Sequence, residues 1–212
     1  MPAVEFDPDC RRCPRLKTFL QQVRRDYPDY HARPVAPFGV ARPQLLIVGL
    51  APGMHGANAT GRPFTGDFAG ILLYETLHRF GYSNRPESVS LDDGLKLKQC
   101  RITNAVKCLP PENKPTSEEV NTCNVFLRQE LISLPSNTAI LALGGIAHKA
   151  ILKALDLKQS AYKFGHAQHF ELPDGRHLVD SYHCSRYNTQ TRRLTEKMFH
   201  DVFRLIDKLT DR

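Results

Sequence analysis

A short apolar run that leads into a long, glycine-rich polar loop constrains this chain more than any other feature of its sequence. Residues 44–48 have the composition of a buried strand, and the loop at 49–67 contains five glycines. In open parallel sheets ligands bind where strands end, and glycine lets the backbone approach a ligand where a Cβ would collide. A second polar loop, 183–191, follows the apolar run at 178–182. We expect the two loops to build one binding site.

The remainder of the chain alternates between apolar runs and amphipathic segments. Runs at 45–50, 101–106 and 139–143 predict buried strands, and a Pro-Asp-Gly turn at 173–175 predicts a hairpin between 167–172 and 176–182. The helical periodicity predicts helices over 69–80, 116–131, 146–155 and 191–209. Strands that alternate with helices form a sheet covered on both faces. The sequence therefore predicts one three-layer α/β/α domain over residues 1–212, with a central, mainly parallel sheet.

Composition limits the kind of partner. No segment approaches the roughly 18 consecutive apolar residues of a membrane span. The amino terminus has no basic segment followed by an apolar one, so we expect a cytoplasmic protein without a membrane partner. The 29 Lys and Arg exceed the 22 Asp and Glu and give a net charge of +7. This excess favours a polyanionic partner, since basic side chains that neutralise phosphates release counterions. A solvated basic face is the alternative.

Six cysteines in a chain without a secretion signal favour metal binding or catalysis over disulfide bonds. Cys10 and Cys13 have the spacing of a metal-ligand pair, whereas Cys108 and Cys123 are further apart than a second tight zinc pair. Thiolates gathered from distant segments suit a [4Fe–4S] cluster. Zinc and free buried cysteines are the alternatives that the spacing leaves open.

Several motifs together resemble those of the uracil-DNA glycosylase superfamily. They are Gly49-Leu-Ala-Pro, Thr60-Gly-Arg-Pro-Phe-Thr-Gly-Asp67, Arg101-Ile-Thr-Asn-Ala-Val-Lys-Cys-Leu-Pro-Pro111, His183-x-Ser-x-x-Asn-Thr189 and Cys10-x-x-Cys13. The set is most similar to the iron-sulfur members of the fifth family, and the similarity covers residues 10–195. It implies a four-stranded parallel sheet between helices and a [4Fe–4S] cofactor. The expected partner is DNA that contains uracil or other deaminated bases, bound by a monomer.

The resemblance also implies a role for individual side chains in releasing a base that has been flipped out of the DNA. Phe64 would stack on the base as an exposed ring, and Asn104 would pair with the pyrimidine edge near O4 and N3. His183 would donate to O2 as negative charge develops there. The expected substrate-binding positions are Gly49, Ala51, Phe64, Asn104, His183, Ser185 and Asn188. From the residues alone, a core-filling phenylalanine and a turn-capping asparagine are the alternatives for Phe64 and Asn104.

The catalytic set is expected to be Asp67, His183 and Asn104. Many superfamily members carry Asp, Asn or Glu inside the first motif, but here that segment is Leu50-Ala51-Pro52. Asp67 is therefore the candidate for positioning water or stabilising a cationic sugar. A helix cap is equally expected at this position, and Asn58 is a weaker candidate for holding the water.

Two features depart from the family pattern. His183-Cys184-Ser185 stands where His-Pro-Ser is common, and residues 191–194 lack the glycine that relatives often carry before the arginine. Neither motif loop holds an obvious Schiff-base lysine, Lys107 being the nearest. The expected activity is monofunctional hydrolysis of the N-glycosidic bond of uracil, and of other deaminated bases, in base excision repair. The alternative is a non-catalytic iron-sulfur protein that binds nucleic acid or carries electrons.

Overall fold

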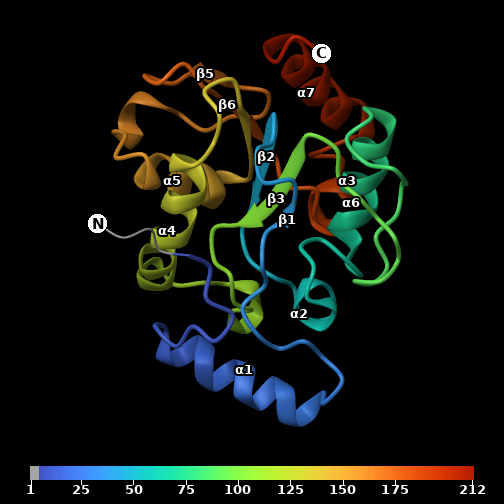
Figure 1. Cartoon of the computed structure of the whole chain (residues 1–212), viewed down its shortest axis with the longest axis vertical. Helices are drawn as coiled ribbons and strands as arrows, with labels where there is room; N and C mark the ends of the chain where they lie inside the picture. The colour runs from blue at the N-terminus through green and yellow to red at the C-terminus, as the bar shows by residue number, and fades with distance from the viewer. Residues whose placement is uncertain (1–4) are drawn as a thin grey trace.

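A six-stranded sheet forms the centre of the computed structural model, which describes residues 5–212 (Figure 1). The strand order is β1-β3-β2-β4-β6-β5. The four inner strands run parallel to one another. They are β3 (Cys100–Asn104), β2 (Leu45–Gly49), β4 (Ala139–Leu143) and β6 (His177–Ser181).

The sheet has six strands, whereas four were expected, because a short strand is added at each edge. β1 (Phe38–Gly39) pairs antiparallel with β3, and β5 (His169–Glu171) pairs antiparallel with β6. The parallel core is thus extended by one short strand at each edge, so the predicted strand number is wrong. The hairpin prediction for the second edge is confirmed by β5 and β6, whereas β1 is too short for its two residues to produce an alternating pattern.

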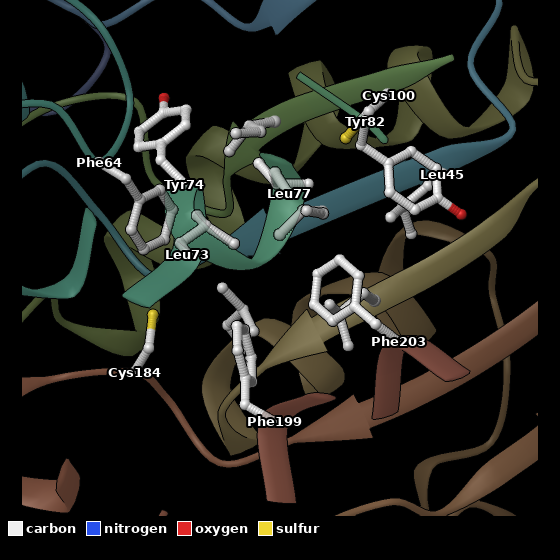
Figure 2. Close-up of a cluster of buried hydrophobic side chains, with 14 of the residues drawn as sticks. Leu45, Phe64, Leu73, Tyr74, Leu77, Tyr82, Cys100, Cys184, Phe199 and Phe203 are labelled. Carbon is white, nitrogen blue, oxygen red and sulfur yellow. The ribbon is translucent and has the colours of Figure 1, made fainter. Parts of the chain in front are cut away.

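Helices cover both faces of the sheet, which confirms the three-layer prediction. α3 (Phe68–Arg79) and α7 (Glu196–Leu209) lie on one face, and α4 (Ser117–Ile132) and α5 (Gly145–Ala154) lie on the other. Figure 2 shows Phe199 and Phe203 of α7 meeting the α3 side chains in the first of these layers. None of the helices within residues 5–212 combines the length and the apolar character that a membrane span requires.

The residues of β2 explain why both faces need a helical layer. All five are buried. Successive side chains of a strand point to opposite faces, so Leu45 and Ile47 join one apolar cluster while Leu46 and Val48 join the other. A strand buried on both sides carries an unbroken apolar run, and this is the pattern that leads into the glycine-rich loop.

The helix predicted over 191–209 begins later than expected, at Glu196. A short helix, α6 (Arg186–Gln190), lies within the second motif loop, and α7 begins only after Thr195, whose side chain accepts a hydrogen bond from the Met198 N–H. Between the two helices Arg192 has a φ of 56°. That left-handed backbone is incompatible with a continuous right-handed helix.

Like α6, two further helices lie outside the predicted elements. α2 (Ala57–Thr60) is a single turn within the glycine-rich loop. α1 (Pro14–Asp26) begins directly after Cys13 and buries three apolar side chains, one of which, Leu20, packs with Leu109 from the loop after β3. In Figure 1, α1 lies across the bottom of the view, near the end of the sheet at which α2 also lies. The helix therefore closes the end of the molecule where the motif loops emerge.

Residues 83–98 hold the glycine-rich loop in place. The buried Arg62 guanidinium lies 2.8 Å from the Asp93 carboxylate. The Thr65 and Ser88 hydroxyls are 2.6 Å apart. Because these two contacts anchor Arg62 and Thr65 to residues 83–98, the part of the glycine-rich loop between them is held in position.

Candidate active site

The two motif loops meet at one cavity beside the carboxyl ends of the parallel strands. It encloses about 410 Å³ and is lined by side chains from residues 50–69 after β2, from Asn104 and Asn113 around the loop after β3, and from residues 183–186 after β6. A volume of this order takes a small ligand. Among the predicted site residues, the cavity brings together Ala51, Phe64, Asp67, Asn104, His183 and Ser185.

Gly49 creates the space in which Asn104 and Phe64 approach each other. The parallel register of β2 and β3 pairs Gly49 with Asn104. A Cβ at Gly49 would lie 2.4 Å from Asn104 Oδ1 and 2.6 Å from Phe64 Cζ. Distances this short are steric overlaps, so only glycine at the end of β2 allows both side chains their positions.

The Asn104 side chain is buried with an unsatisfied acceptor. It is 4% exposed, and its Oδ1 has no hydrogen-bond partner within residues 5–212. A turn-capping asparagine would use this oxygen as an acceptor. Leaving a buried acceptor unpaired costs about 1–3 kcal/mol, so an unpaired Oδ1 in the wall of a cavity indicates a position prepared for a ligand that donates a hydrogen bond.

Phe64 differs from its predicted position. Its ring is 5% exposed, so the prediction of an exposed ring is wrong. It packs into the same apolar cluster as Leu73 and Tyr74 (Figure 2). It also stacks on the His183 imidazole, with ring centroids 5.8 Å apart and planes inclined by 28°. The ring still lines the cavity, so Phe64 belongs both to the core and to the wall of the site.

Asp67 is a helix cap that also faces the cavity. Its Oδ1 accepts a hydrogen bond of 2.8 Å from the Gly70 N–H at the start of α3, which confirms the cap. Its Oδ2 lies on the side of the loop at Gly53 and Gly56. Burial raises the pKa of the Asp67 carboxyl, and the N–H groups of Gly70 and Ala69 oppose that rise. The cap uses one oxygen, and the second is directed towards the glycine-rich loop.

His183 is held by its own loop. The Asn188 amide donates a hydrogen bond of 2.8 Å to the His183 carbonyl, and Ser185 precedes α6 at the cavity wall. Burial lowers the pKa of His183 to about 4. The imidazole is therefore neutral at pH 7, and a neutral imidazole still offers one N–H donor.

This shift predicts the titration of His183. Since its pKa in the folded protein lies below that of an unfolded histidine, near 6.5, we expect its imidazole NMR signals to titrate with a midpoint near pH 4. Protonation favours the unfolded chain, so this residue contributes stability above pH 6.5 that is lost as the pH falls towards 4. A midpoint near 6.5 in the folded protein would contradict a neutral His183 at this site.

The cavity contains two polar residues that the sequence pattern did not reveal, Asn113 and Arg186. The Arg186 guanidinium lies 5.1 Å from the centroid of the Phe68 ring. The sequence feature that could have identified Arg186 as a site residue is its position inside the second motif loop. Asn113 carried no signal, because it follows neighbouring prolines in a segment with no periodicity. Asn58 is buried with an unpaired Oδ1 among the described residues, but its neighbour Ala57 is the residue that lines the cavity.

The four cysteines of the expected ligand set line a second cavity. Cys10 and Cys13 approach it from the start of α1, Cys108 from the loop after β3, and Cys123 from α4. Burial, with the neighbouring thiol of Cys123 as the next cause, raises the pKa of Cys13 to about 11. Within residues 5–212, no three His, Cys, Asp or Glu side chains are grouped closely enough to hold a single metal ion.

The other two cysteines lie apart from this cavity. Cys100 in β3 and Cys184 after β6 are fully buried in the apolar cluster beneath α3 (Figure 2). Burial raises the pKa of both thiols. Cys184 thus fills core space directly after His183 of the second motif loop.

Comparison with known proteins gives a consistent result. The family described as the uracil DNA glycosylase superfamily matches residues 36–206. A type-5 uracil-DNA glycosylase from Thermus thermophilus is 49% identical over 198 residues, which is 91% of this chain and 90% of that protein. A type-5 uracil-DNA glycosylase from Pyrobaculum aerophilum is 42% identical over 92% of this chain and 87% of its own length. A type-4 uracil-DNA glycosylase from Archaeoglobus fulgidus is 33% identical over 70% of this chain.

Proposed function

This chain belongs to the uracil-DNA glycosylase superfamily, and from that membership we propose that it hydrolyses the N-glycosidic bond of uracil in DNA during base excision repair. The relatives named type-5 uracil-DNA glycosylase support the fifth family in particular. The observation that carries the proposal is the unpaired Asn104 Oδ1 in a cavity that also contains Phe64 and His183.

The proposed mechanism assigns one task to each wall of the cavity. An enzyme that acts on a base inside a duplex must first flip the nucleotide into a pocket. The flipped uracil stacks on Phe64, and the Asn104 carboxamide pairs with its edge, because an amide offers both a donor and an acceptor. As the bond to the sugar breaks, the neutral His183 donates its N–H to the developing oxyanion at O2. Asp67 Oδ2 stabilises the cationic sugar or holds the attacking water.

The environment of Lys107 supports hydrolysis by water rather than by a Schiff base. Lys107 is 2% exposed, and its Nζ lies 2.6 Å from Glu130 Oε1 and donates to the Thr103 hydroxyl. It lines the cysteine cavity and not the base cavity, and its amine is engaged by Glu130. The proposal is therefore a monofunctional enzyme. The volume of the base cavity, about 410 Å³, supports tolerance of other deaminated bases.

A [4Fe–4S] cluster fits the cysteine cavity in chemical terms. The cube binds each thiolate through a different iron, so its ligand sulfurs are spread around the cube and need not converge on one point. The apolar walls from Leu16 and Phe126 suit such a group, and the Lys107 N–H lies 3.3 Å from Cys123 Sγ. We propose Cys10, Cys13, Cys108 and Cys123 as its ligands. When bound, the cluster supplies a structural cross-link between α1, the loop after β3 and α4.

The ligand assignment predicts which cysteine variants lose iron. Cys108→Ala should abolish the visible absorbance and the iron content of the purified protein, because it removes one of four thiolates. Cys184→Ser is the matched control, since Cys184 lies in the apolar core, and it should retain iron. Full iron content in Cys108→Ala would show that the assignment is wrong.

We also propose that the chain acts in the cytoplasm and as a monomer. One chain supplies all three loops around the base cavity, which supports action as a monomer. Its cysteines are all unpaired, as is usual in the reducing cytoplasm.

The activity is tested with an oligonucleotide that carries one uracil, followed by alkali to cleave any abasic site. We expect a cut strand with the uracil substrate and none with the matched thymine control. An uncut uracil strand in every sequence context, both single- and double-stranded, would favour the non-catalytic alternative.

A further inference from the structure

We propose that a basic groove beside α1 binds the phosphate backbone of the DNA strand that flanks the flipped nucleotide. The groove encloses about 160 Å³ between residues 8–11, α1 and the turn at 32–34. The charged side chains that line it are Arg11, Lys17, Arg24, Arg33 and Asp9. The inference rests on the proposed function, because it assumes that the base cavity holds a nucleotide of the same strand.

The spacing of residues along α1 gives one wall of the groove its charge. Lys17, Gln21 and Arg24 are separated by four and then by three residues, which places them on one face of the helix. Arg33 lines the groove from the turn that follows. The four cations of the groove outnumber its single carboxylate, that of Asp9, so the groove favours an anionic ligand.

The four cations are available to such a ligand. Within residues 5–212 none of them belongs to an ion pair, whereas Arg15, also on α1, lies 2.7 Å from the Glu119 carboxylate. Arg24 donates to the Ala32 carbonyl at 2.8 Å, which holds its guanidinium beside the turn and leaves further N–H donors on the same group. Arg33 is exposed. Guanidinium groups with free donors bind phosphate oxygens well, often through two hydrogen bonds.

The groove adjoins the base cavity through the glycine-rich loop. The Ala32 N–H donates to the Asn58 carbonyl at 3.0 Å, and Asn58 lies in α2 next to Ala57 of the base-cavity wall. The Tyr30 hydroxyl and His55 Nδ1 are 2.8 Å apart and make a second link between the chain after α1 and this loop. Figure 1 shows α1 and α2 near the same end of the sheet. A strand whose base occupies the cavity therefore passes α2 on its way to the groove.

The position of Cys10 connects the groove to the proposed cluster. Cys10 and Lys17 line both the groove and the cysteine cavity. A cluster bound through Cys10 would therefore hold residues 8–11 in place as one wall of the groove. Basic side chains along such a groove contact phosphates without reading the sequence, and each phosphate that they neutralise releases counterions. The groove should therefore contribute to affinity through its dependence on salt.

The test uses two substitutions of opposite charge in the full, iron-containing protein. Arg33→Gln removes one cation from the groove, and Gln21→Lys adds one on the face of α1 that lines it. Both positions are exposed, and neither lines the base cavity. Lys158→Gln is the matched control, because Lys158 is exposed and lines neither the groove nor the base cavity.

Affinity is measured over a range of salt for duplexes that carry one non-cleavable uracil nucleotide. One duplex has long arms on both sides of the uracil, two have either the upstream or the downstream arm cut short, and one has both arms cut short. The iron content of each variant is measured to show that the cluster is retained. Excision of uracil by the parent protein is measured separately.

On the long duplex we expect the slope of log affinity against log salt to become shallower by about one unit in Arg33→Gln and steeper by about one unit in Gln21→Lys, since each variant changes one phosphate contact. Lys158→Gln should keep the slope of the parent. Both changes should vanish when the arm that reaches the groove is cut short. Parent slopes in both groove variants, or changes that persist when both arms are short, would overturn the inference. A parent that binds but does not excise uracil would reject the proposed function alone.

Discussion

Asp67→Asn is expected to slow single-turnover excision of uracil by about 10²-fold or more while α3 stays intact. Asparagine keeps an oxygen that can accept the Gly70 N–H, so the cap survives. It removes the negative charge on the side that faces Gly53 and Gly56, where the proposed mechanism needs it. The measurement is single-turnover kinetics together with thermal unfolding of the same protein.

Asp67→Ala is the companion variant, because it removes both the cap and the charge. Loss of the cap alone costs about 1 kcal/mol, so this protein should be both slow and less stable. Combining Asp67→Asn with His183→Ala should give a loss smaller than the product of the two single losses, since both groups act on one transition state. If Asp67→Asn is fully active and Asp67→Ala unfolds, Asp67 is only a cap, and Asn58 or the backbone of residues 51–56 must hold the water.

Asn104→Asp is expected to reduce excision by a similar factor, about 10²-fold or more, without weakening the binding of abasic DNA. The replacement exchanges the amide donor for a second acceptor, which would face the lone pairs of uracil O4. An unmade hydrogen bond in a buried site costs the full desolvation of both partners. The readouts are single-turnover excision of uracil and affinity for a duplex with an abasic-site analogue, the second serving as the control for folding.

Retained uracil excision in a folded Asn104→Asp protein would mean that Asn104 is a turn residue. Gly49→Ala tests the same geometry from the neighbouring strand. Its Cβ would overlap both Asn104 and Phe64, so this variant should lose excision to a comparable degree by displacing both side chains.

The sheet was largely predictable from the sequence because its inner strands are buried on both faces. β2 and β4 are buried at every residue, and such strands appear in the sequence as apolar runs. The break before α7 was not predictable in the same way. Leu194 is fully buried and continues the apolar spacing of the helix, although it lies in the segment that separates α6 from α7.

The sequence predicted which residue types form the candidate site, but it did not predict how far each side chain is buried or where it points. Phe64 is flanked by Pro63 and Thr65, which suggested an exposed ring. The loop is turned inwards by the distant Arg62–Asp93 pair, so the ring is buried. Asn113 could not be found because its position depends on two left-handed residues that no periodicity indicates. The same holds for the second role of Asp67, since the sequence does not say where its free oxygen points.

The segment that runs from the end of β3 to α4 carries Asn104 of the base cavity, then Cys108 of the cysteine cavity, and then Asn113 of the base cavity. A single stretch of backbone therefore sets the spacing of two sites at once. An insertion or deletion inside it would move thiol and amide together, and no local adjustment could restore both. Efforts to redesign base preference should keep the length of this segment constant and vary Ser185 instead, which lines the base cavity and not the cysteine cavity.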